Sequence, residues 1–416
     1  MKIMVYSHDA FGLGNIRRML AICQHLLRTL PKVSILVVSG SPALHSLQLP
    51  AGLDYIKLPC VGRDESGELA VKYLDAGMDE TVKLRSDLIL TTTASFKPDL
   101  LLVDKKPDGL QGELQDTLNY LRANCPKTKL VLLLRDILDR PETTIQQWQR
   151  HNYYNLIESL YDQVWVIGTP EIFDVRREYR FPRQVARKVQ FCGYIHREPG
   201  LKPRPVLRQE LAIQPDESLV LVTPGGGGDG FRLVKTYLSG LGCLPSDRKI
   251  RSLIVSGPEM PQSQREELCE IAETHPQVRV EEFTDDLIGY MEAADVVVSM
   301  GGHNTVSEIL SLRKRAIVVP RVKPVEEQWI RAERMAKMRL FKMLHPDRLT
   351  PQQLMQTLLE ELDMARNAVL SMPYLDMDAL PRIADYLSEL LHSSSRILAT
   401  SYSEPRSAKL PLEATV

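Results

Sequence analysis

The stretch DVVVSMGGHNTVSEILSLRKRAIVVP, residues 295–320, decides the fold of this chain. It opens with valines at 296–298, and such an uninterrupted β-branched run is typical of a strand buried on both faces. A glycine pair follows, and the spacing of Thr305 and Glu308 matches a capping box, which predicts a helix as far as Leu312. The start of this helix exposes backbone N–H groups that suit an anion, although an ordinary βα turn has the same pattern.

The same alternation of apolar strands and helices runs along the whole chain. An amphipathic helix is predicted at 15–27, and strands are predicted at 2–6, 34–40, 99–104, 129–136, 163–168, 188–193, 219–224, 251–257, 277–283, 294–300 and 315–320. The alternation breaks at 197–218, a segment with four prolines that is typical of a linker. This pattern predicts two doubly wound, Rossmann-like α/β domains with parallel sheets that face a central cleft.

These patterns also set the domain boundaries. We predict an N-terminal domain at 1–196, a linker at 197–217, a C-terminal domain at 218–365, a helical segment at 366–392 and a disordered tail at 393–416. Ligands of doubly wound sheets bind beyond the carboxyl ends of the strands, so we expect the functional site in the cleft between the two domains.

Composition excludes several classes of protein. With 416 residues, 44% of them apolar, the chain can build two cores, and its net charge of -1 argues against a nucleic-acid-binding surface. The six cysteines form no CxxC pair, which indicates reduced thiols. No signal peptide or apolar stretch of bilayer length is visible, so we expect a cytoplasmic protein. The basic segment 176–188 is either a solvated face or a contact for anionic lipids at the inner face of the membrane.

Three predicted strand–loop–helix units carry glycines, at 8–18, 223–232 and 299–308. The first lacks the third glycine of GxGxxG because Arg17 stands there, and the second lacks the Lys-Ser/Thr pair of a P-loop. Backbone amides of these loops can therefore hold an anion without the magnesium ligand of an NTPase. The only DxD, at 376–378, falls in a predicted helical region, so neither a metal ion nor an organic cofactor is expected.

Residues 281–328 resemble the C-terminal domain of glycosyltransferase family 28. The resemblance rests on an aromatic–Thr–Asp–Asp run, ADVVVS, the glycine pair, Thr-x-x-Glu, a valine strand ending in proline, and Glu-Gln. The family includes the N-acetylglucosaminyltransferase that makes the lipid-linked peptidoglycan precursor. HDAFGLGNIRR together with residues 96–114 is similar to a little-characterised bacterial branch of predicted glycosyltransferases. The resemblance implies a GT-B fold, in which the last helix crosses back to the first domain.

The resemblance implies that residues of both C-terminal glycine loops and their neighbours bind a nucleotide-sugar donor. These residues are Gly226, Gly227, Gly228, Phe283, Thr284, Gly301, Gly302, His303, Asn304, Thr305, Glu308, Glu327 and Gln328. The family's glycine turn holds the donor diphosphate, its glutamate holds the ribose, and its Glu-Gln pair contacts the sugar hydroxyls.

Each of these implied roles has a structural alternative. Glu308 either holds the ribose hydroxyls or only caps the helix. Phe283 either lies beside the nucleobase or belongs to the core. Glu327 and Gln328 either contact the donor sugar or begin a solvated helix. His303 either donates to a phosphate oxygen and offsets the charge of the leaving group, or holds the glycine turn.

The N-terminal glycine loop, with Gly12, Gly14 and Asn15, departs from the family pattern. The family has a histidine where this chain has Asn15, and an amide cannot accept a proton at neutral pH. General base catalysis typically contributes 10²–10⁴-fold, so another group is needed for an active enzyme. We expect His8 or Asp9, which end the first strand, to be the catalytic base. Two other carboxylates at strand ends of the same sheet are further candidates: Asp104 and Asp136.

These observations predict a metal-independent, inverting glycosyltransferase. It would transfer a sugar from a nucleotide sugar, expected to be UDP-linked, to the hydroxyl of an unknown acceptor, which is lipid-linked, a glycan or a small molecule. Two alternatives stay open: a non-hydrolysing sugar-nucleotide epimerase, which shares the fold, and a nucleotide-sugar-binding protein that has lost catalysis, for which Asn15 is the argument.

Overall fold

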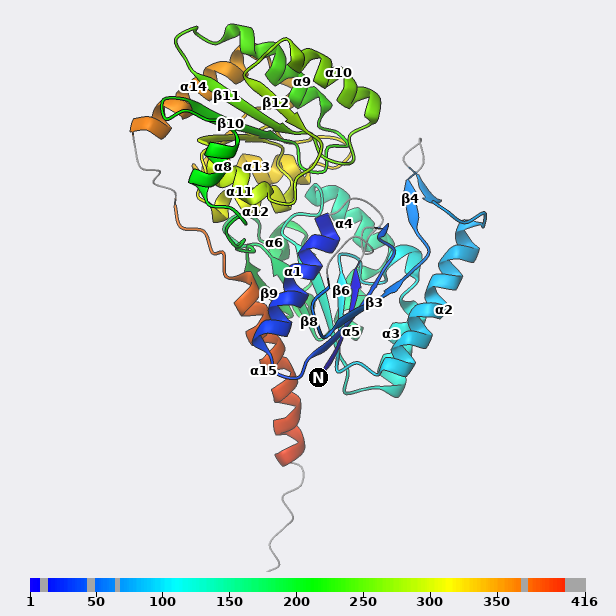
Figure 1. Cartoon of the computed structure of the whole chain (residues 1–416). Helices are drawn as coiled ribbons and strands as arrows, with labels where there is room; N and C mark the ends of the chain where they lie inside the picture. Colours follow the sequence, from blue (N-terminus) through cyan, green and yellow to red (C-terminus); the bar gives the residue numbers. More distant parts are fainter. Residues whose placement is uncertain (8–13, 43–48, 64–67, 368–372, 401–416) are drawn as a thin grey trace, which may run out of the picture.

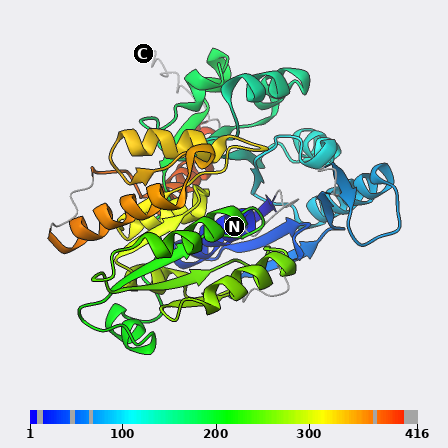
Figure 2. The same ribbon diagram turned by 90° about the horizontal axis from the view of Figure 1, so that it is seen from above.

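The computed structural model describes residues 1–7, 14–42, 49–63, 68–367 and 373–400. These residues form two α/β domains stacked on each other, and a long helix from the end of the chain runs back along the N-terminal domain (Figure 1). Seen along the stack, the segment around α2 projects to one side of the C-terminal domain (Figure 2). The fold is mixed α/β with parallel sheets, as the sequence predicts.

A parallel sheet forms the centre of the N-terminal domain. Within the described ranges it has seven strands in the order β3-β2-β1-β6-β7-β8-β9. Their bounds are β1 (Lys2–Ser7), β2 (Ser34–Ser39), β3 (Leu53–Lys57), β6 (Leu100–Asp104), β7 (Lys129–Arg135), β8 (Gln163–Ile167) and β9 (Val189–Gly193). Every residue of β6 is buried, which explains why its sequence has no polar alternation.

Helices cover both faces of this sheet. They are α1 (Gly14–Thr29), α2 (Met78–Phe96), η2 (Leu110–Gly112), α3 (Gln115–Asn124), α4 (Pro141–Arg150), α5 (Tyr153–Leu160), α6 (Val175–Glu178), α7 (Arg183–Ala186) and, from the chain end, α15 (Ala379–Thr400). Because side chains of a strand alternate between faces, Ile3 and Val5 of β1 pack with α1 and α15, whereas Met4 and Tyr6 pack with α2, α3 and α5.

The C-terminal domain repeats this architecture. In the part of the chain that is described, six parallel strands follow the order β12-β11-β10-β13-β14-β15. The strands are β10 (Ser218–Thr223), β11 (Ile250–Val255), β12 (Val278–Glu281), β13 (Val296–Ser299), β14 (Ala316–Val318) and β15 (Lys342–Met343). The helices are α9 (Phe231–Gly240), η3 (Leu241–Cys243), α10 (Gln262–Glu273), α11 (Leu287–Ala293), α12 (His303–Ser311), α13 (Glu327–Lys337), η4 (Pro346–Arg348) and α14 (Pro351–Asn367).

The two domains share one continuous apolar core. Helices α9, α10 and α14 pack on one face of the C-terminal sheet and form a separate cluster. On the other face, Val297 of β13, Val306 of α12 and Ala332 of α13 belong to the same cluster as Leu132 of β7. Burial of apolar surface therefore holds α12 and α13, the two helices that follow the resembling segment, against the N-terminal domain.

The hydrophobic periodicity of the sequence does not predict several short strands. β3 and β15 are edge strands of only five and two residues. β4 (Val61–Arg63) and β5 (Leu69–Val71) form an antiparallel hairpin outside the two main sheets. Such segments are short or partly exposed, so they lack the apolar runs that identify central strands.

Helices in the linker and at the chain end differ from the prediction. A helix, α8 (Arg204–Glu210), forms inside the predicted linker. Helix α15 continues to Thr400, past residue 393 where a disordered tail was expected, and residues 401–416 lie outside the described residues. The expectation that the last helix crosses back is confirmed, because Ile383 and Leu387 of α15 pack into the core beneath α1.

Within the described ranges, none of the helices combines the length and apolar content that crossing a membrane requires.

We predict that α15 stabilises the N-terminal domain through its buried face. Ile383 is fully buried, so Ile383→Ala should lower the free energy of unfolding by about 2–5 kcal/mol. Asp385→Ala, a change on the exposed face of the same helix, should change it by less than about 0.5 kcal/mol. Denaturant unfolding followed by tryptophan fluorescence measures both. Equal stability of the two variants would show that α15 is not part of the folded domain.

Candidate active site

The glycine turn after β13 leads directly into α12. The helix begins at His303 with Gly302 as its N-cap, and no side chain within the described residues caps it. The predicted capping box is therefore wrong, because Thr305 already lies inside the first turn and Glu308 further along the helix. The first turn, His303 to Thr305, contains no carboxylate, so no side chain of that turn offsets the partial positive charge of the helix end.

The two glycines of this turn have different surroundings. A side chain at Gly301 would meet the backbone oxygen of Gln328 at 3.1 Å, so this glycine allows α13 to approach. At Gly302, by contrast, the nearest atom to an added Cβ is Thr305 Oγ1, at 4.0 Å. Among the described residues there is thus open space beside the free amides of α12, and that space is where an anion can come close.

The second glycine loop, at 224–230, lies against the same helix. A Cβ at Gly225 would lie 3.4 Å from Thr305 Oγ1. Gly225 and Gly227 have φ of 85° and 97°, and a Cβ at Gly227 would lie 2.3 Å from the backbone oxygen of Ser256. Glycine is therefore required at 227 both for its backbone conformation and for close packing. The two C-terminal glycine segments that the sequence singles out are next to each other.

The N-terminal glycine loop also meets α12. Asn304 donates from Nδ2 to the backbone oxygen of Gly14 at 3.0 Å, and Arg197 donates to Asn304 Oδ1 at 3.3 Å. Asn15 Oδ1 accepts from Arg18 at 3.4 Å, and Arg18 pairs with Asp104 at 2.6 Å. The predicted bases His8 and Asp9, together with Gly12, lie outside the described residues.

His303 is buried as the first residue of α12. Its Nε2 lies 3.4 Å from the backbone oxygen of Ile167 and 4.0 Å from Asp136 Oδ1, and its ring lies 5.8 Å from that of Tyr194. Burial lowers the pKa of His303 to about 3, although the negative charge of Asp136 acts to raise it. The imidazole is therefore neutral at pH 7, and these contacts favour the role of holding the turn over that of offsetting phosphate charge.

The structural alternatives for Glu308 and Phe283 can be checked against their surroundings. Glu308 is half-buried, and burial raises the pKa of its carboxyl although Arg197 and Arg17 oppose the shift. It does not cap α12, so the capping alternative is excluded. The Phe283 side chain is 50% exposed, which excludes the core alternative. Thr284, its neighbour, accepts a hydrogen bond from the backbone N–H of Asp286 at 3.1 Å.

Glu327 and Gln328 begin α13, and both are buried, so a solvated helix start is excluded. Glu327 pairs through Oε2 with Arg135 at 3.0 Å and with Arg331 at 3.4 Å. Despite burial, these arginines lower the pKa of Glu327 to about 2. Gln328 accepts from the backbone N–H of Arg321 at 3.1 Å.

One guanidinium joins these elements. Arg331, which is fully buried, donates from Nε and Nη2 to the two carboxylate oxygens of Asp136, at 3.1 and 2.9 Å, and from Nη1 to the backbone oxygen of Gly301 at 3.0 Å. The charge of Arg331 and a hydrogen bond from Tyr194 hold the pKa of Asp136 well below its usual range. Arg331 and Tyr194 carry no motif, so no sequence signal marks them.

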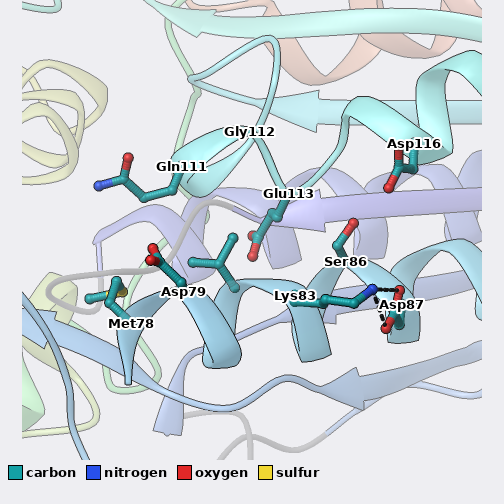
Figure 3. A pocket seen from close by; sticks show the side chains of 10 residues that line it. Met78, Asp79, Lys83, Ser86, Asp87, Gln111, Gly112, Glu113 and Asp116 are labelled. Carbon is teal, nitrogen blue, oxygen red and sulfur yellow. Dashed lines mark hydrogen bonds and ion pairs between the residues drawn. The ribbon is translucent and has the colours of Figure 1, made fainter. Parts of the chain in front are cut away.

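A cavity of about 450 Å³ opens in the N-terminal domain. Its walls are one face of α2 and the segment from η2 to α3, and the residues that line it are Met78, Asp79, Val82, Lys83, Ser86, Asp87, Gln111, Gly112, Glu113 and Asp116. Figure 3 shows Lys83 paired with Asp87 on α2 and Glu113 pointing toward this helix from the opposite wall. Most of the lining is polar, so the cavity suits a ligand rich in hydroxyl or amino groups.

Two cations of the basic segment 176–188 have partners within the protein. Arg176 binds Asp174 at 2.9 Å and stacks over Phe191, and the Lys188 ammonium donates to backbone oxygens at the end of α5, including that of Tyr161 at 2.6 Å. These partners favour a structural role for part of the segment.

Known glycosyltransferases are similar in sequence to parts of this chain. Residues 219–376 match the glycosyltransferase family 28 C-terminal domain. An uncharacterised glycosyltransferase of Methanopyrus kandleri is 25% identical over 210 residues, which span 50% of this chain and 56% of the relative. The UDP-N-acetylglucosamine–N-acetylmuramyl-(pentapeptide) pyrophosphoryl-undecaprenol N-acetylglucosamine transferase of Fusobacterium nucleatum is 32% identical over 116 residues, which span 27% of this chain and 30% of the relative.

Solved structures extend the likeness of fold to nearly the whole chain. MurG of Acinetobacter baumannii has a TM-score of 0.58 at 16% identity and covers 93% of this chain and 99% of its own. The UDP-GlcNAc 2-epimerase of Neisseria meningitidis bound to UDP-GlcNAc has a TM-score of 0.56 at 13% identity, with 94% and 100% covered. The chain therefore has the GT-B fold. Residues 219–376 are similar to the C-terminal domain of glycosyltransferase family 28, so the predicted resemblance and the predicted fold are both confirmed.

We predict that His303 makes stability depend on pH in mildly acidic solution. Its pKa is about 3 in the folded protein and about 6.5 when unfolded, so below pH 6.5 the unfolded state takes up a proton that the folded state does not. Wild-type protein should lose roughly 1–2 kcal/mol through this group between pH 7 and pH 5. His303→Gln lacks that loss, so the stability difference between the two proteins should shrink at pH 5. An unchanged difference in denaturant unfolding would contradict the neutral imidazole.

Proposed function

We propose that this protein is a metal-independent glycosyltransferase that transfers a sugar from a nucleotide sugar, with uridine as the expected base, to an acceptor hydroxyl. The observation that carries the proposal is the meeting of an uncapped α12, open space at Gly302 and the glycine loop at 224–230. A single exposed helix end contributes only about 0.3–1 kcal/mol to anion binding. A diphosphate therefore needs further contacts, which the glycine loop at 224–230 would supply.

The donor would lie along α12. Its diphosphate would take hydrogen bonds from the amides at the start of the helix, with Gly226, Gly227 and Gly228 on the other side. Glu308 would bind the ribose hydroxyls, since its carboxylate caps nothing. The exposed face of Phe283 would lie beside the base, with Thr284 next to it. The N-terminal residues of α13, Glu327 and Gln328, would contact the sugar.

The acceptor would enter from the N-terminal domain. The polar cavity between α2 and α3 lies in the N-terminal domain, which supports it as the acceptor site. In the proposed step the acceptor oxygen bonds to the anomeric carbon as the bond from that carbon to the diphosphate breaks. The acceptor proton passes to a base, the nucleoside diphosphate leaves, and attack from the opposite face inverts the configuration.

The candidates for the catalytic base differ in the hydrogen bonds that they already form. Asp136 is a poor candidate because both of its oxygens bind Arg331 and its pKa is low. Asp104 retains Oδ2, which is buried and has no hydrogen-bond partner among the described residues. His8 and Asp9 stay our proposal for this role. We also propose a cytoplasmic location, with the inner face of the membrane as a further contact if the acceptor is lipid-linked.

We predict that a side chain at Gly302 blocks donor binding. Gly302→Leu fits without a clash but fills the space beside the free amides, so the affinity for UDP should fall by at least about tenfold. The matched control is Gly77→Leu, because Gly77 is the N-cap of α2, has similar dihedrals (φ −66°, ψ 156°, against −62° and 141°) and also has open space. Calorimetry with UDP in the presence of EDTA measures both.

The same titration separates the alternatives. No affinity of the wild-type protein for UDP, or for GDP and dTDP sugars, would refute the donor site. Affinity with epimerised donor as the product would favour the epimerase, and affinity without any turnover would favour a binding protein that has lost catalysis. Transfer to an acceptor would support the proposal.

We predict that filling the N-terminal cavity impairs transfer without affecting donor binding. Ser86→Trp places an indole in the cavity, so kcat/KM for the acceptor should fall by about tenfold or more while UDP affinity stays unchanged. Leu84→Trp, on the exposed outer face of α2, is the control and should transfer normally. Transfer from radiolabelled UDP-sugar to a panel of acceptors provides the rates. Normal transfer by Ser86→Trp would exclude this cavity as the acceptor site.

A further inference from the structure

The glycine turn of the C-terminal domain is linked through Arg331 to Asp136 of the N-terminal domain. Arg331 binds the backbone oxygen of Gly301 through Nη1, at 3.0 Å, and uses Nε and Nη2 for the carboxylate of Asp136. Asp136 directly follows β7, whereas Arg331 and Gly301 belong to the other domain. One guanidinium therefore fixes the turn and the relative position of the two domains at the same time.

Asp136 is itself rigidly placed. Its Oδ1 accepts from the backbone N–H of Ile137 at 2.8 Å, and its Oδ2 accepts from the hydroxyl of Tyr194 at 2.6 Å. Asp136 is fully buried, and its Cβ lies 2.5 Å from where a Cβ on Gly168 would be. Because hydrogen bonds and packing fix the carboxylate, it can fix the guanidinium in turn.

Among the other contacts between α13 and the N-terminal domain, Glu327 pairs with Arg135 beside Arg331, and two further ion pairs lie farther out. Glu326 pairs with Arg140 at 2.5 Å, and Arg334 pairs with Glu178 at 2.8 Å. The side chains of the second pair are both 31% exposed, so water and salt weaken it. Neither pair touches the glycine turn in the described residues, whereas Arg331 does.

We propose that Asp136 is a positioning residue for the donor: through Arg331 it shapes the phosphate-binding turn, so that nucleotide affinity depends on contact between the two domains. The inference rests on the proposed function, because it concerns the same nucleotide site. Without the carboxylate, Arg331 loses two of its hydrogen bonds and its orientation toward Gly301. The turn then samples conformations in which the α12 amides no longer converge, and binding must select the competent one.

The test compares two N-terminal carboxylates that each pair with an arginine of α13. Asp136→Asn keeps the size of the side chain but removes its charge, and Glu178→Gln does the same at the outer pair. Affinity for UDP is measured by calorimetry with EDTA present, and thermal unfolding and circular dichroism verify that each variant is folded. A third variant, Arg331→Lys, keeps the charge but cannot form the paired hydrogen bonds to Asp136.

We expect Asp136→Asn and Arg331→Lys to bind UDP about 5- to 150-fold more weakly, the range of typical coupling between sites, and Glu178→Gln to bind like wild type. A folded Asp136→Asn or Arg331→Lys with wild-type affinity would overturn the inference. So would equal weakening by Glu178→Gln, because the effect would then come from loosened domains in general. Absence of UDP binding by the wild-type protein would refute the proposed function instead, so the two failures are distinguishable.

Discussion

The paired hydrogen bonds between Asp136 and Arg331 are the buried interaction that joins the two domains beside the glycine turn. Both side chains are fully buried between the domains, where a charge without its partner is costly. Removal of one partner from a buried pair typically costs on the order of 3–5 kcal/mol, more than an exposed pair contributes. The good geometry of this pair, its extra hydrogen bond from Tyr194 and its contact with Gly301 offset the desolvation.

Several ionisable side chains near this pair are matched by an opposite charge or held neutral. Glu327 is surrounded by arginines, Arg18 is paired with Asp104, and His303 is held neutral by burial. The start of α12 has neither a capping side chain nor a carboxylate in its first turn. An anion in the cleft would therefore interact mainly with oriented backbone amides, which need no reorganisation when the ligand arrives.

The sequence predicts the architecture well because the central strands are buried on both faces, and burial leaves continuous apolar runs such as residues 296–298. Local reasoning fails where tertiary contacts decide. Thr305 and Glu308 have capping-box spacing, yet α12 begins two residues before Thr305 because Gly302 adopts the N-cap conformation. The burial of Glu327 depends on Arg135, far away along the chain, and no local period reports such a pairing. The role of Arg331 likewise depends on a residue that is distant in sequence, Asp136, so no local pattern predicts it.

The central claim is that a nucleoside diphosphate binds at the start of α12, and hydrogen–deuterium exchange with and without UDP, in EDTA, tests it most directly. The account predicts slower exchange at residues 299–308 and 223–232, because the diphosphate would hydrogen-bond to those amides. It also predicts slower exchange in α13, which Arg331 links to the turn. No change at 299–308, or protection confined to the walls of the N-terminal cavity at 78–87 and 111–116, would contradict it.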